Sequence, residues 1–412
     1  MLDIKFIREN AKKVEQNAKN KGYKVDIDKL LEVDKKRREL IEAVDKLRSK
    51  RKEFAQKRDE KKGQQLKKDL KLDENKLEKL NEEFYDFIRQ VPNLAKDDIP
   101  VGRDESENKV IRQVGRKTQF NFKPKDHLEL GESLDLIDVE RSSKISGPRQ
   151  SFIKNELVTL ELALVNFCFE LLEDEGFIKI IPPVIINKKA VAGLGYPEYE
   201  RGEGYKLDSP RQTGDQFLVG TAEHSIVPMH MDEVFDSKDL PRRYAAFSTS
   251  FRREAGSYGK DNRGIFRVHQ FDKIEMVSFI NPKDDKNELE YLLSLQEKLV
   301  KALDLPYQVV EMCTGDLGFP TAKKIDIETW LPAQNEYRET HSVSTTTDFQ
   351  SRRLNIKYRN GDQTGFVHIL NGTAFAIGRT LIAIMENYQQ KDGSIEIPKV
   401  LQKYTGFSEI SA

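Results

Sequence analysis

The sequence predicts an α+β protein in which an N-terminal antiparallel helical hairpin precedes an antiparallel sheet flanked by helices. Residues 26–91 contain no proline and repeat apolar residues every seven positions, whereas glycine and proline punctuate residues 92–148. From about residue 150, strand-like and helix-like runs alternate, and short turns join neighbouring strands. We therefore expect an N-terminal domain at 1–98 with the hairpin at 26–91, a connector at 99–148 and a larger domain at 149–412.

Composition excludes several classes of protein. The chain has 412 residues, more than one hydrophobic core usually holds, and its 69 Lys and Arg equal its 69 Asp and Glu, so any basic surface must be local. No run approaches the ~18 apolar residues of a membrane span, and the N-terminus lacks a signal sequence, which predicts a cytoplasmic protein without membrane contact. Two cysteines, Cys168 and Cys313, and six scattered histidines predict buried free thiols and no zinc site.

The hairpin prediction follows from two heptad series. The first is Val33, Leu40, Leu47 and Phe54, and the second is Leu70, Leu77, Phe84 and Val91. Such spacing places one apolar seam along each helix, so two antiparallel helices can zip together. A helix of ~35 residues is ~50 Å long, which predicts a projecting arm.

Positive charge is concentrated around the bend of this hairpin. Residues 46–68 contain eleven positive and three negative residues, an excess of eight positive charges. The positive residues are Lys46, Arg48, Lys50, Arg51, Lys52, Lys57, Arg58, Lys61, Lys62, Lys67 and Lys68. A solvated coiled-coil surface and a footprint for a nucleic-acid phosphate backbone explain this excess equally well.

The larger domain alternates strands with helices. A long apolar helix at 151–174 is stopped by Gly176, and Pro182 and Pro183 interrupt the strand that follows. Strands are predicted at 177–186, 215–220, 243–254, 265–280, 307–313, 324–331 and 336–344, and further helices at 222–235, 286–303 and 374–389. Adjacent strand pairs with short turns favour an antiparallel sheet.

The predicted hairpin from Tyr244 to Phe279 carries the densest group of functional side chains. Arg252 and Glu254 are two residues apart, so a strand would place both on one face. The returning strand alternates a functional set, which comprises Arg267, His269, Phe271, Lys273 and Glu275, with apolar residues. The turn at 255–264 is glycine-rich and basic, as required to fold over a triphosphate. A half-exposed sheet with cross-strand ion pairs is the alternative.

A second group surrounds Arg379, which lies in an otherwise apolar helix after Asn371, Gly372 and Thr373. A buried arginine requires an anionic or aromatic partner. That partner is either an internal carboxylate such as Glu386 or a bound nucleotide.

These motifs together resemble the bacterial type of seryl-tRNA synthetase, a class II aminoacyl-tRNA synthetase, over essentially the whole chain. Residues 176–183 resemble class II motif 1, and 219–223 (VGTAE) resemble the family's TAE motif. Residues 251–254 (FRRE) with 267–275 (RVHQFDKIE) match motif 2, and 370–373 (LNGT) with Gly378 and Arg379 match motif 3. Their order and spacing are highly specific.

The resemblance implies a set of site residues. Arg252 would bind the ATP α-phosphate, Phe271 and Arg379 would sandwich adenine, and Glu254 would contact the adenine side. ATP would be bound by Arg252, Arg253, Glu254, Val268, Phe271, Glu339, Thr340, His341, Ser342 and Arg379, of which Arg252, Glu254, Glu339 and Arg379 form the catalytic set. Serine would be bound by Thr221, Ala222, Glu223, Arg252, Glu275, Asn371 and Thr373. Magnesium would be bound by Glu339 and Ser342, which are three residues apart and therefore need a β-bulge to share a face.

Three segments depart from the family pattern. Thr373 stands where the family has serine, residues 339–345 (ETHSVST) differ from the usual EISSCSN, and residues 193–199 lack the usual lysine and glutamine. These changes affect the fine geometry of the substrate pocket.

The resemblance implies ATP-dependent activation of serine and its transfer to tRNA(Ser), with tRNA(Sec) as a further candidate. The basic hairpin would bind the tRNA, and motif 1 implies a homodimer whose interface contains the 151–174 helix and the following strand. Two alternatives stay open: a ligase that loads a carrier protein, which would not need the basic hairpin, and a non-catalytic RNA-binding protein, which would not need Arg252, Glu254, Glu275 and Arg379.

Overall fold

The computed structural model describes residues 1–56, 60–196, 199–208, 214–254 and 264–411. The chain divides into two compact units, Met1–Leu94 and Ala95–Ala412. Cys168 and Cys313 are both buried free thiols, as predicted. No helix of the described residues is long and apolar enough to cross a membrane.

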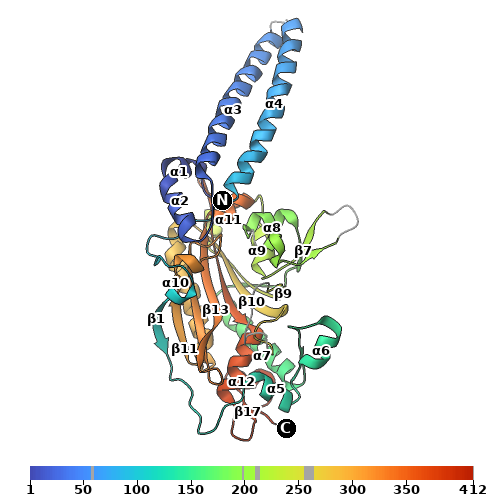
Figure 1. Cartoon of the computed structure of the whole chain (residues 1–412), viewed down its shortest axis with the longest axis vertical. Helices are drawn as coiled ribbons and strands as arrows, with labels where there is room; N and C mark the ends of the chain where they lie inside the picture. Colours follow the sequence, from blue (N-terminus) through green and yellow to red (C-terminus); the bar gives the residue numbers. More distant parts are fainter. Residues whose placement is uncertain (57–59, 197–198, 209–213, 255–263, 412) are drawn as a thin grey trace. The chain divides into compact units, whose positions relative to one another are not determined.

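The first unit is helical, and its two long helices confirm the predicted hairpin (Figure 1). Its elements are α1 (Ile4–Glu9), α2 (Ala11–Asn20), α3 (Ile27–Gln56) and α4 (Glu60–Ile88). The seam residues Val33 and Phe84 are buried, and the guanidinium carbon of Arg37 lies 4.8 Å from the Phe84 ring centre. The heptad spacing therefore does pair α3 with α4, because apolar side chains on both helices leave water together.

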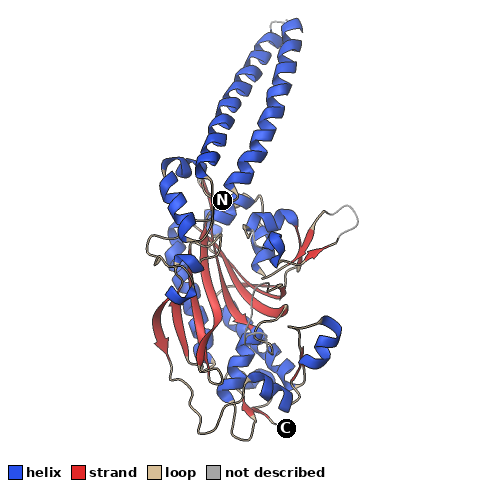
Figure 2. Cartoon of the chain, in the orientation of Figure 1, coloured by secondary structure: helices blue, strands red, loops and turns tan. Residues whose placement is uncertain are grey.

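The second unit is built on a sheet that contains eight strands of the described residues (Figure 2). The order is β1-β11-β12-β13-β16-β10-β9-β4, and every pairing is antiparallel except that of β4 with β9. The strands are β1 (Lys109–Val114), β4 (Ile178–Ile180), β9 (Arg242–Phe251), β10 (Gln270–Ile280), β11 (Tyr307–Glu311), β12 (Lys323–Leu331), β13 (Glu336–Thr347) and β16 (His368–Ala376). The predicted antiparallel sheet is confirmed.

Helices cover both faces of this sheet. The helices of the second unit are α5 (His127–Ser133), α6 (Val139–Ser146), α7 (Glu156–Asp174), α8 (Lys188–Leu194), α9 (Glu223–Met229), α10 (Asp285–Ala302), α11 (Phe349–Leu354), α12 (Ile377–Tyr388) and α13 (Gln402–Thr405). Alternate strand residues enter separate cores: Ala245 and Met276 pack with α7, α10 and α12, whereas Ala246 and Val277 pack with α8, α9 and α11. The strand period of two thus divides the apolar residues between two layers.

Short strands complete the described fold. They are β2 (Ile137–Asp138), β3 (Phe152–Ile153), β5 (Ile185–Asn187), β6 (Lys206–Leu207), β7 (Gln216–Leu218), β8 (Val234–Asp236), β14 (Lys357–Asn360), β15 (Gln363–Phe366), β17 (Ile395–Glu396) and β18 (Glu409–Ile410). The segment 99–148, predicted as a connector, contributes the edge strand β1 and helix α5 to the second unit, and α5 packs on α12. β1 is exposed along most of its length, so its sequence lacks the alternation that identifies a half-buried strand.

Several predicted boundaries were wrong. The helix expected at 374–389 begins at Ile377, because the preceding residues continue strand β16. The helix expected at 222–235 ends at Met229 and is followed by β8. The interruption expected at Pro182 and Pro183 is confirmed, since β4 ends before these prolines and β5 begins after them. The hairpin strands are also shorter than predicted, since β9 ends at Phe251 and β10 starts at Gln270.

The α7 face of the sheet contains a pair of carboxyl groups, and we predict that this pair makes stability depend on pH. Burial, together with the neighbouring Asp272, raises the pKa of Glu161 to about 8. Between these two pKa values the folded chain holds a proton that the unfolded chain releases. The contribution of Glu161 to the free energy of unfolding is therefore fully present below pH ~4.5 and is lost as the pH rises to about 8. Between pH 5 and pH 8, the Tm of the parent should fall by roughly 5 °C relative to that of Glu161→Gln.

The measurement is thermal unfolding of both proteins followed by circular dichroism from pH 5 to pH 9. The exposed Glu156, also on α7, supplies the control Glu156→Gln, which should follow the parent at every pH. A constant Tm difference between the parent and Glu161→Gln across this range would contradict the prediction.

Candidate active site

A cavity of about 630 Å³ opens on the sheet face that carries α8 and α9. Its walls come from β10, β12, β13 and β16, from the start of α12, from Arg252 and Glu254 just beyond β9, and from residues 265–268. The segments around Tyr196, Tyr199 and Glu203, around 220–224 and around 316–321 complete them. The predicted residues that line it are Thr221, Glu223, Arg252, Glu254, Val268, Phe271, Glu275, Glu339, Thr340, Ser342, Asn371, Thr373 and Arg379. The TAE motif, motif 2, motif 3 and the segment 339–342, which lie far apart in the chain, thus contribute to one site.

Arg252 lies just beyond the last residue of β9, so strand alternation does not explain its direction. Its backbone N–H donates to the carbonyl of His269 (2.9 Å), which continues the ladder, and its Nε donates to the carbonyl of Gly220 (3.0 Å). The guanidinium carbon lies 5.3 Å from the ring centre of Phe271. Glu254 has a positive φ of 50° and pairs with Arg267, with 3.6 Å between Oε2 and Nε. Both predicted side chains reach the cavity, although neither lies in a strand.

Lys273 and Glu275 form a buried ion pair on β10. Lys273 Nζ lies 2.6 Å from Glu275 Oε2, and the Thr373 hydroxyl donates to the same oxygen at 3.2 Å. Burial lowers the pKa of Lys273, whereas the Glu275 carboxylate opposes this shift. Because Glu275 is opposite Thr373 in the β10–β16 register, the pairing of these strands places a carboxylate beside a hydroxyl. Such a pair can hydrogen-bond a small alcohol.

Glu223, the first residue of α9, is a buried carboxylate that is surrounded by neutral donors. It accepts hydrogen bonds from the Tyr196 hydroxyl (3.1 Å to Oε1), from Gln350 Nε2 (2.7 Å to Oε1) and from Asn371 Nδ2. Burial raises its pKa, an effect that Glu275 reinforces and the hydrogen bonds from Gln350 and Tyr196 oppose. A cationic ligand such as an ammonium group would stabilise the ionised form.

A β-bulge places Glu339 and Ser342 in the same cavity, as the sequence required. Ile327 pairs with His341 but the next residue, Glu328, pairs with Glu339, so Thr340 is the extra residue. Burial disfavours ionisation of Glu339, yet the charges of Arg379 and Lys324 lower its pKa to about 2. The carboxylate is therefore anionic at neutral pH.

Arg379 contacts Glu339, not Glu386. Its Nη1 lies 3.1 Å from Glu339 Oε2 and donates to the Glu339 carbonyl at 2.9 Å. The predicted internal partner, Glu386, bonds other groups, because it lies two helical turns further along α12. The guanidinium carbon of Arg379 is also 4.9 Å from the ring centre of Phe266. Arg379 and Phe271 both line the cavity, and the adenine sandwich stays a prediction.

Three predicted residues do not line the cavity. Arg253 points its guanidinium carbon at the Tyr205 ring, 5.2 Å from its centre, and Ala222 is buried in the core. The His341 ring packs on Phe375, and burial lowers the pKa of this histidine to about 3. Strand alternation turns the His341 side chain away from the face that carries Ser342.

Sequence reasoning missed several cavity residues. Tyr196 and Phe266 line the wall, and so does Lys324, whose Nζ is 2.9 Å from Asp326 Oδ2. Gln350 reaches Glu223 from α11 without lining the wall. Arg267 and Lys273 also line the cavity, and both carried a usable signal: they belong to the predicted alternating set that contains Phe271 and Glu275, but neither was given a role.

Nine of the eleven predicted basic residues belong to the described parts of α3 and α4. Lys46, Arg48, Lys50, Arg51, Lys52, Lys67 and Lys68 are exposed on α3 and α4. Two of them have acidic partners: Lys46 Nζ is 2.6 Å from Glu42 Oε1, and Arg48 Nη2 is 2.8 Å from Glu74 Oε1. Lys61 and Lys62 belong to α4, whereas Lys57 and Arg58 lie outside the described residues.

Comparisons with known proteins agree with this arrangement. Residues 1–95 match the seryl-tRNA synthetase N-terminal domain, and residues 205–388 match the tRNA synthetase class II core domain (G, H, P, S and T). The serine–tRNA ligase of Thermodesulfovibrio yellowstonii is 41% identical over 428 residues, which cover all of both chains.

Two solved structures of similar proteins match the whole chain. Seryl-tRNA synthetase from Pyrococcus horikoshii, crystallised with ATP, matches 100% of this chain and 99% of its own with a TM-score of 0.91 and 36% identity. Cytoplasmic serine–tRNA ligase from Naegleria fowleri, in complex with AMP, matches with a TM-score of 0.89 and 32% identity over 100% and 99% of the two chains. Agreement in sequence and fold over its full length shows that this chain belongs to the seryl-tRNA synthetase family of class II aminoacyl-tRNA synthetases.

Proposed function

We propose that the chain activates L-serine with ATP to form seryl-adenylate and then transfers the seryl group to a hydroxyl at the 3′ end of tRNA(Ser), with AMP as the leaving group. The observation that carries this proposal is the cavity itself. It combines a buried carboxylate at Glu223, a carboxylate–hydroxyl pair at Glu275 and Thr373, and the two arginines Arg252 and Arg379.

The serine subsite follows from these contacts. We propose that Glu223 accepts the ammonium group and that Glu275 and Thr373 bind the hydroxyl. Alanine has no hydroxyl to bond this buried pair, and losing that hydrogen bond would cost ~1–3 kcal/mol. Threonine must be excluded sterically. The methyl group of Thr373 makes the pocket narrower than it would be with serine, the usual residue of the family at this position.

The nucleotide would occupy the rest of the cavity. We propose that Arg252 binds the α-phosphate and that Phe271 and Arg379 hold adenine, with Glu254 and Val268 beside it. A serine carboxylate oxygen attacks the α-phosphorus, the bond to the bridging oxygen of the β-phosphate breaks, and pyrophosphate leaves. Orientation and charge stabilisation suffice for this step, so no protein nucleophile is needed.

Residues for a magnesium ion are present. Among the described residues, no group of three His, Cys, Asp or Glu side chains could hold a metal by itself. Glu339 is anionic, Ser342 offers a hydroxyl on the same wall, and buried Asp326 Oδ1 has no hydrogen-bond partner in the described chain. Mg²⁺ is commonly held by one or two carboxylates together with substrate phosphates and water, so we propose Glu339 and Ser342 as its protein ligands. Bound there, it would neutralise phosphate charge.

The function is tested by ATP–pyrophosphate exchange with each of the twenty amino acids, followed by aminoacylation of total tRNA. Exchange that depends on serine and seryl-tRNA as the product are expected. Exchange that does not prefer serine, followed by loading of a carrier protein when one is supplied, would favour the carrier-protein alternative. No exchange with any amino acid would favour a non-catalytic RNA-binding protein.

We further propose that the hairpin binds tRNA through the phosphate backbone, since its exposed positive charge gathers in one region and a double helix of RNA offers little sequence readout. Replacing Lys50, Lys52, Lys67 and Lys68 by Gln should weaken tRNA charging and spare exchange. The plot of log affinity against log salt concentration should become shallower by up to about 3, for four lost phosphate contacts. Filter binding from 50 to 300 mM KCl measures this slope.

The matched control removes the same number of charges elsewhere on the hairpin. The exposed lysines Lys35, Lys36, Lys76 and Lys79 replaced by Gln should leave the slope near that of the parent. Equal slopes for the parent and the first variant would mean that this surface does not bind phosphates.

A homodimer, tRNA(Sec) as a second substrate and a cytoplasmic location complete the proposal. The dimer is supported by apolar side chains exposed on the predicted interface, among which Leu162 on α7 is 56% exposed and Ile181 after β4 is 77% exposed. The division of labour between a tRNA-binding domain at 1–98 and a catalytic domain at 149–412 is likewise a proposal.

A further inference from the structure

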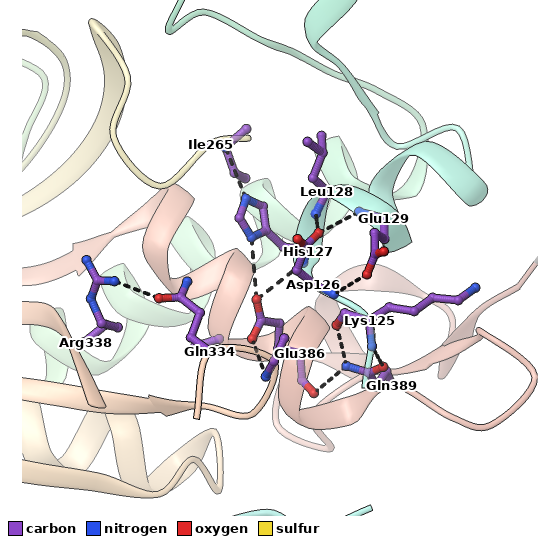
Figure 3. A network of polar contacts seen from close by, with 12 residues as sticks. Lys125, Asp126, His127, Leu128, Glu129, Ile265, Gln334, Arg338, Glu386 and Gln389 are labelled. Carbon is purple, nitrogen blue, oxygen red and sulfur yellow. Dashed lines mark hydrogen bonds and ion pairs between the residues drawn. The ribbon is translucent and has the colours of Figure 1, made fainter. Parts of the chain in front are cut away.

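A buried group of polar contacts joins two helices to a segment of the cavity wall (Figure 3). His127 is the first residue of α5, Glu386 lies on α12, and Ile265 belongs to the segment that leads back into β10. The side chain of Glu386 is completely buried and that of His127 nearly so. His127 and Glu386 have no role in the proposed reaction, and neither of these two residues lines the cavity.

One hydrogen bond shows which ring nitrogen of His127 acts as the acceptor. The Ile265 N–H donates to Nε2 (3.3 Å), so Nε2 carries a lone pair and the proton of the neutral ring sits on Nδ1. Nδ1 lies 3.5 Å from Glu386 Oε1, which also accepts the backbone N–H of His127 at 3.3 Å. The other carboxylate oxygen accepts the N–H of Ala333 at 3.1 Å. Glu386 therefore ties α5 and the turn between β12 and β13 to α12.

The His127 ring packs directly against the backbone of the returning segment. Gly264 has a φ of +65°, and a Cβ built on it would lie 2.0 Å from His127 Nε2. The segment can approach the ring this closely only because residue 264 has no side chain.

Phe266, which follows Ile265 and lines the cavity, links this polar group to the cavity wall. The guanidinium carbon of Arg338 lies 4.4 Å from the Phe266 ring centre, and Arg338 Nη1 donates to Gln334 Oε1 (2.7 Å) in the turn that contains Ala333. Arg379 contacts the same ring, and residues 265–268 line the cavity. Arg379 and Glu386 are seven residues apart on α12, which places both on one face of the helix. One helix thus presents Arg379 to the cavity and anchors the segment that carries Phe266.

We propose that His127 and Glu386 are positioning residues for ATP binding: they fix the backbone of Gly264 and Ile265, and thereby hold Phe266 and Arg267 in the cavity wall. The inference rests on the proposed function, since it takes the cavity to bind the nucleotide. A purely structural role would instead lower stability and leave the affinity for ATP unchanged.

The test compares KM values for ATP and for serine in pyrophosphate exchange. For His127→Ala, the KM for ATP should rise ~10-fold, because a displacement of ~1 Å in a positioning group is enough for such a loss. The KM for serine should stay within about twofold, because the serine subsite is built from other segments. His127→Gln should restore the ATP KM to within about threefold of the parent, because its amide oxygen can accept the Ile265 N–H.

A second route to the same displacement keeps His127 in place. Gly264→Ala should raise the ATP KM through its clash with the ring, and the double variant Gly264→Ala/His127→Ala should be no worse than the worse single variant, because both changes release the same contact. If His127→Ala does not fold, Glu386→Gln provides the measurement, and it too should raise the ATP KM. The glutamine keeps the volume, but its NH₂ group faces one of the two backbone N–H groups that donate hydrogen bonds to the carboxylate.

His230 supplies the matched control. It is a buried histidine of the same unit that bonds Glu233 and Tyr244 and does not line the cavity. His230→Ala should lower Tm without changing the ATP KM. A folded His127→Ala protein with the ATP KM of the parent, or a His127→Gln protein as impaired as His127→Ala, would overturn the inference alone. A parent chain without serine-dependent exchange would overturn the proposed function, and this inference with it.

Discussion

Arg252→Ala should abolish most serine-dependent pyrophosphate exchange, lowering kcat by ~100–1,000-fold, the loss expected when one group that stabilises developing charge is removed. The guanidinium is held from two sides, by the Gly220 carbonyl and by the Phe271 ring. It is therefore oriented before substrate binds, and no reorganisation is required when charge develops at phosphorus. Exchange kinetics at saturating ATP and serine measure the loss.

Arg242 provides the comparison for this experiment, because it is an exposed arginine at the other end of β9. Arg242→Ala should retain exchange close to that of the parent. Arg252→Lys should recover only part of the activity, since an ammonium cannot reproduce the planar fork of a guanidinium. If Arg252→Ala kept the parent kcat while its circular dichroism spectrum showed a native fold, the proposed contact with the α-phosphate would be wrong.

Glu223→Gln should raise the KM for serine by ~10–100-fold, because a hydrogen bond to a charged group contributes about 1.5–3 kcal/mol. The three neutral donors around Glu223 leave its negative charge without a cationic partner at hydrogen-bond distance among the described contacts, so a ligand ammonium would provide that partner. The glutamine keeps the volume and can keep some of these bonds. The KM for ATP should change little.

Tyr196→Phe tests the same carboxylate from the other side. It removes one neutral donor to the Glu223 carboxylate without changing a charge, so the proposed attraction to the ammonium group is kept and the serine KM should change by less than ~10-fold. Titration of exchange with serine at fixed ATP gives both values. A larger effect of Tyr196→Phe than of Glu223→Gln would mean that Glu223 does not bind the ammonium group.

Part of the candidate site was implied by the family resemblance. The TAE segment and motif 2 pointed to Thr221, Glu223, Arg252 and Glu275, and all four line the cavity. Others needed the fold. Tyr196 lies in a segment with no periodicity, and Gln350 reaches Glu223 across 127 positions of sequence, a contact that no local spacing encodes.

Arg379 illustrates the limit most clearly. Its position in an apolar helix predicted a charged partner, which was correct, but not the identity of that partner. Glu386 is nearer in sequence, yet Glu339 is the carboxylate that strand β13 brings to the start of α12. The choice depends on the bulge at Thr340, which follows from the register between two strands and not from the residues next to Arg379.

The sequence by itself determined the paired helices of the hairpin, the antiparallel sheet and the order of the functional motifs, because each depends on a period or a spacing that is written along the chain. Only the tertiary structure decided that β1 completes the sheet edge, that Arg379 pairs with Glu339, and that Glu386 and His127 hold the segment beside Phe266. These contacts form between groups that are far apart in sequence. Their geometry is set by strand register and by the packing of α5 and α12 in one core, which no local pattern specifies.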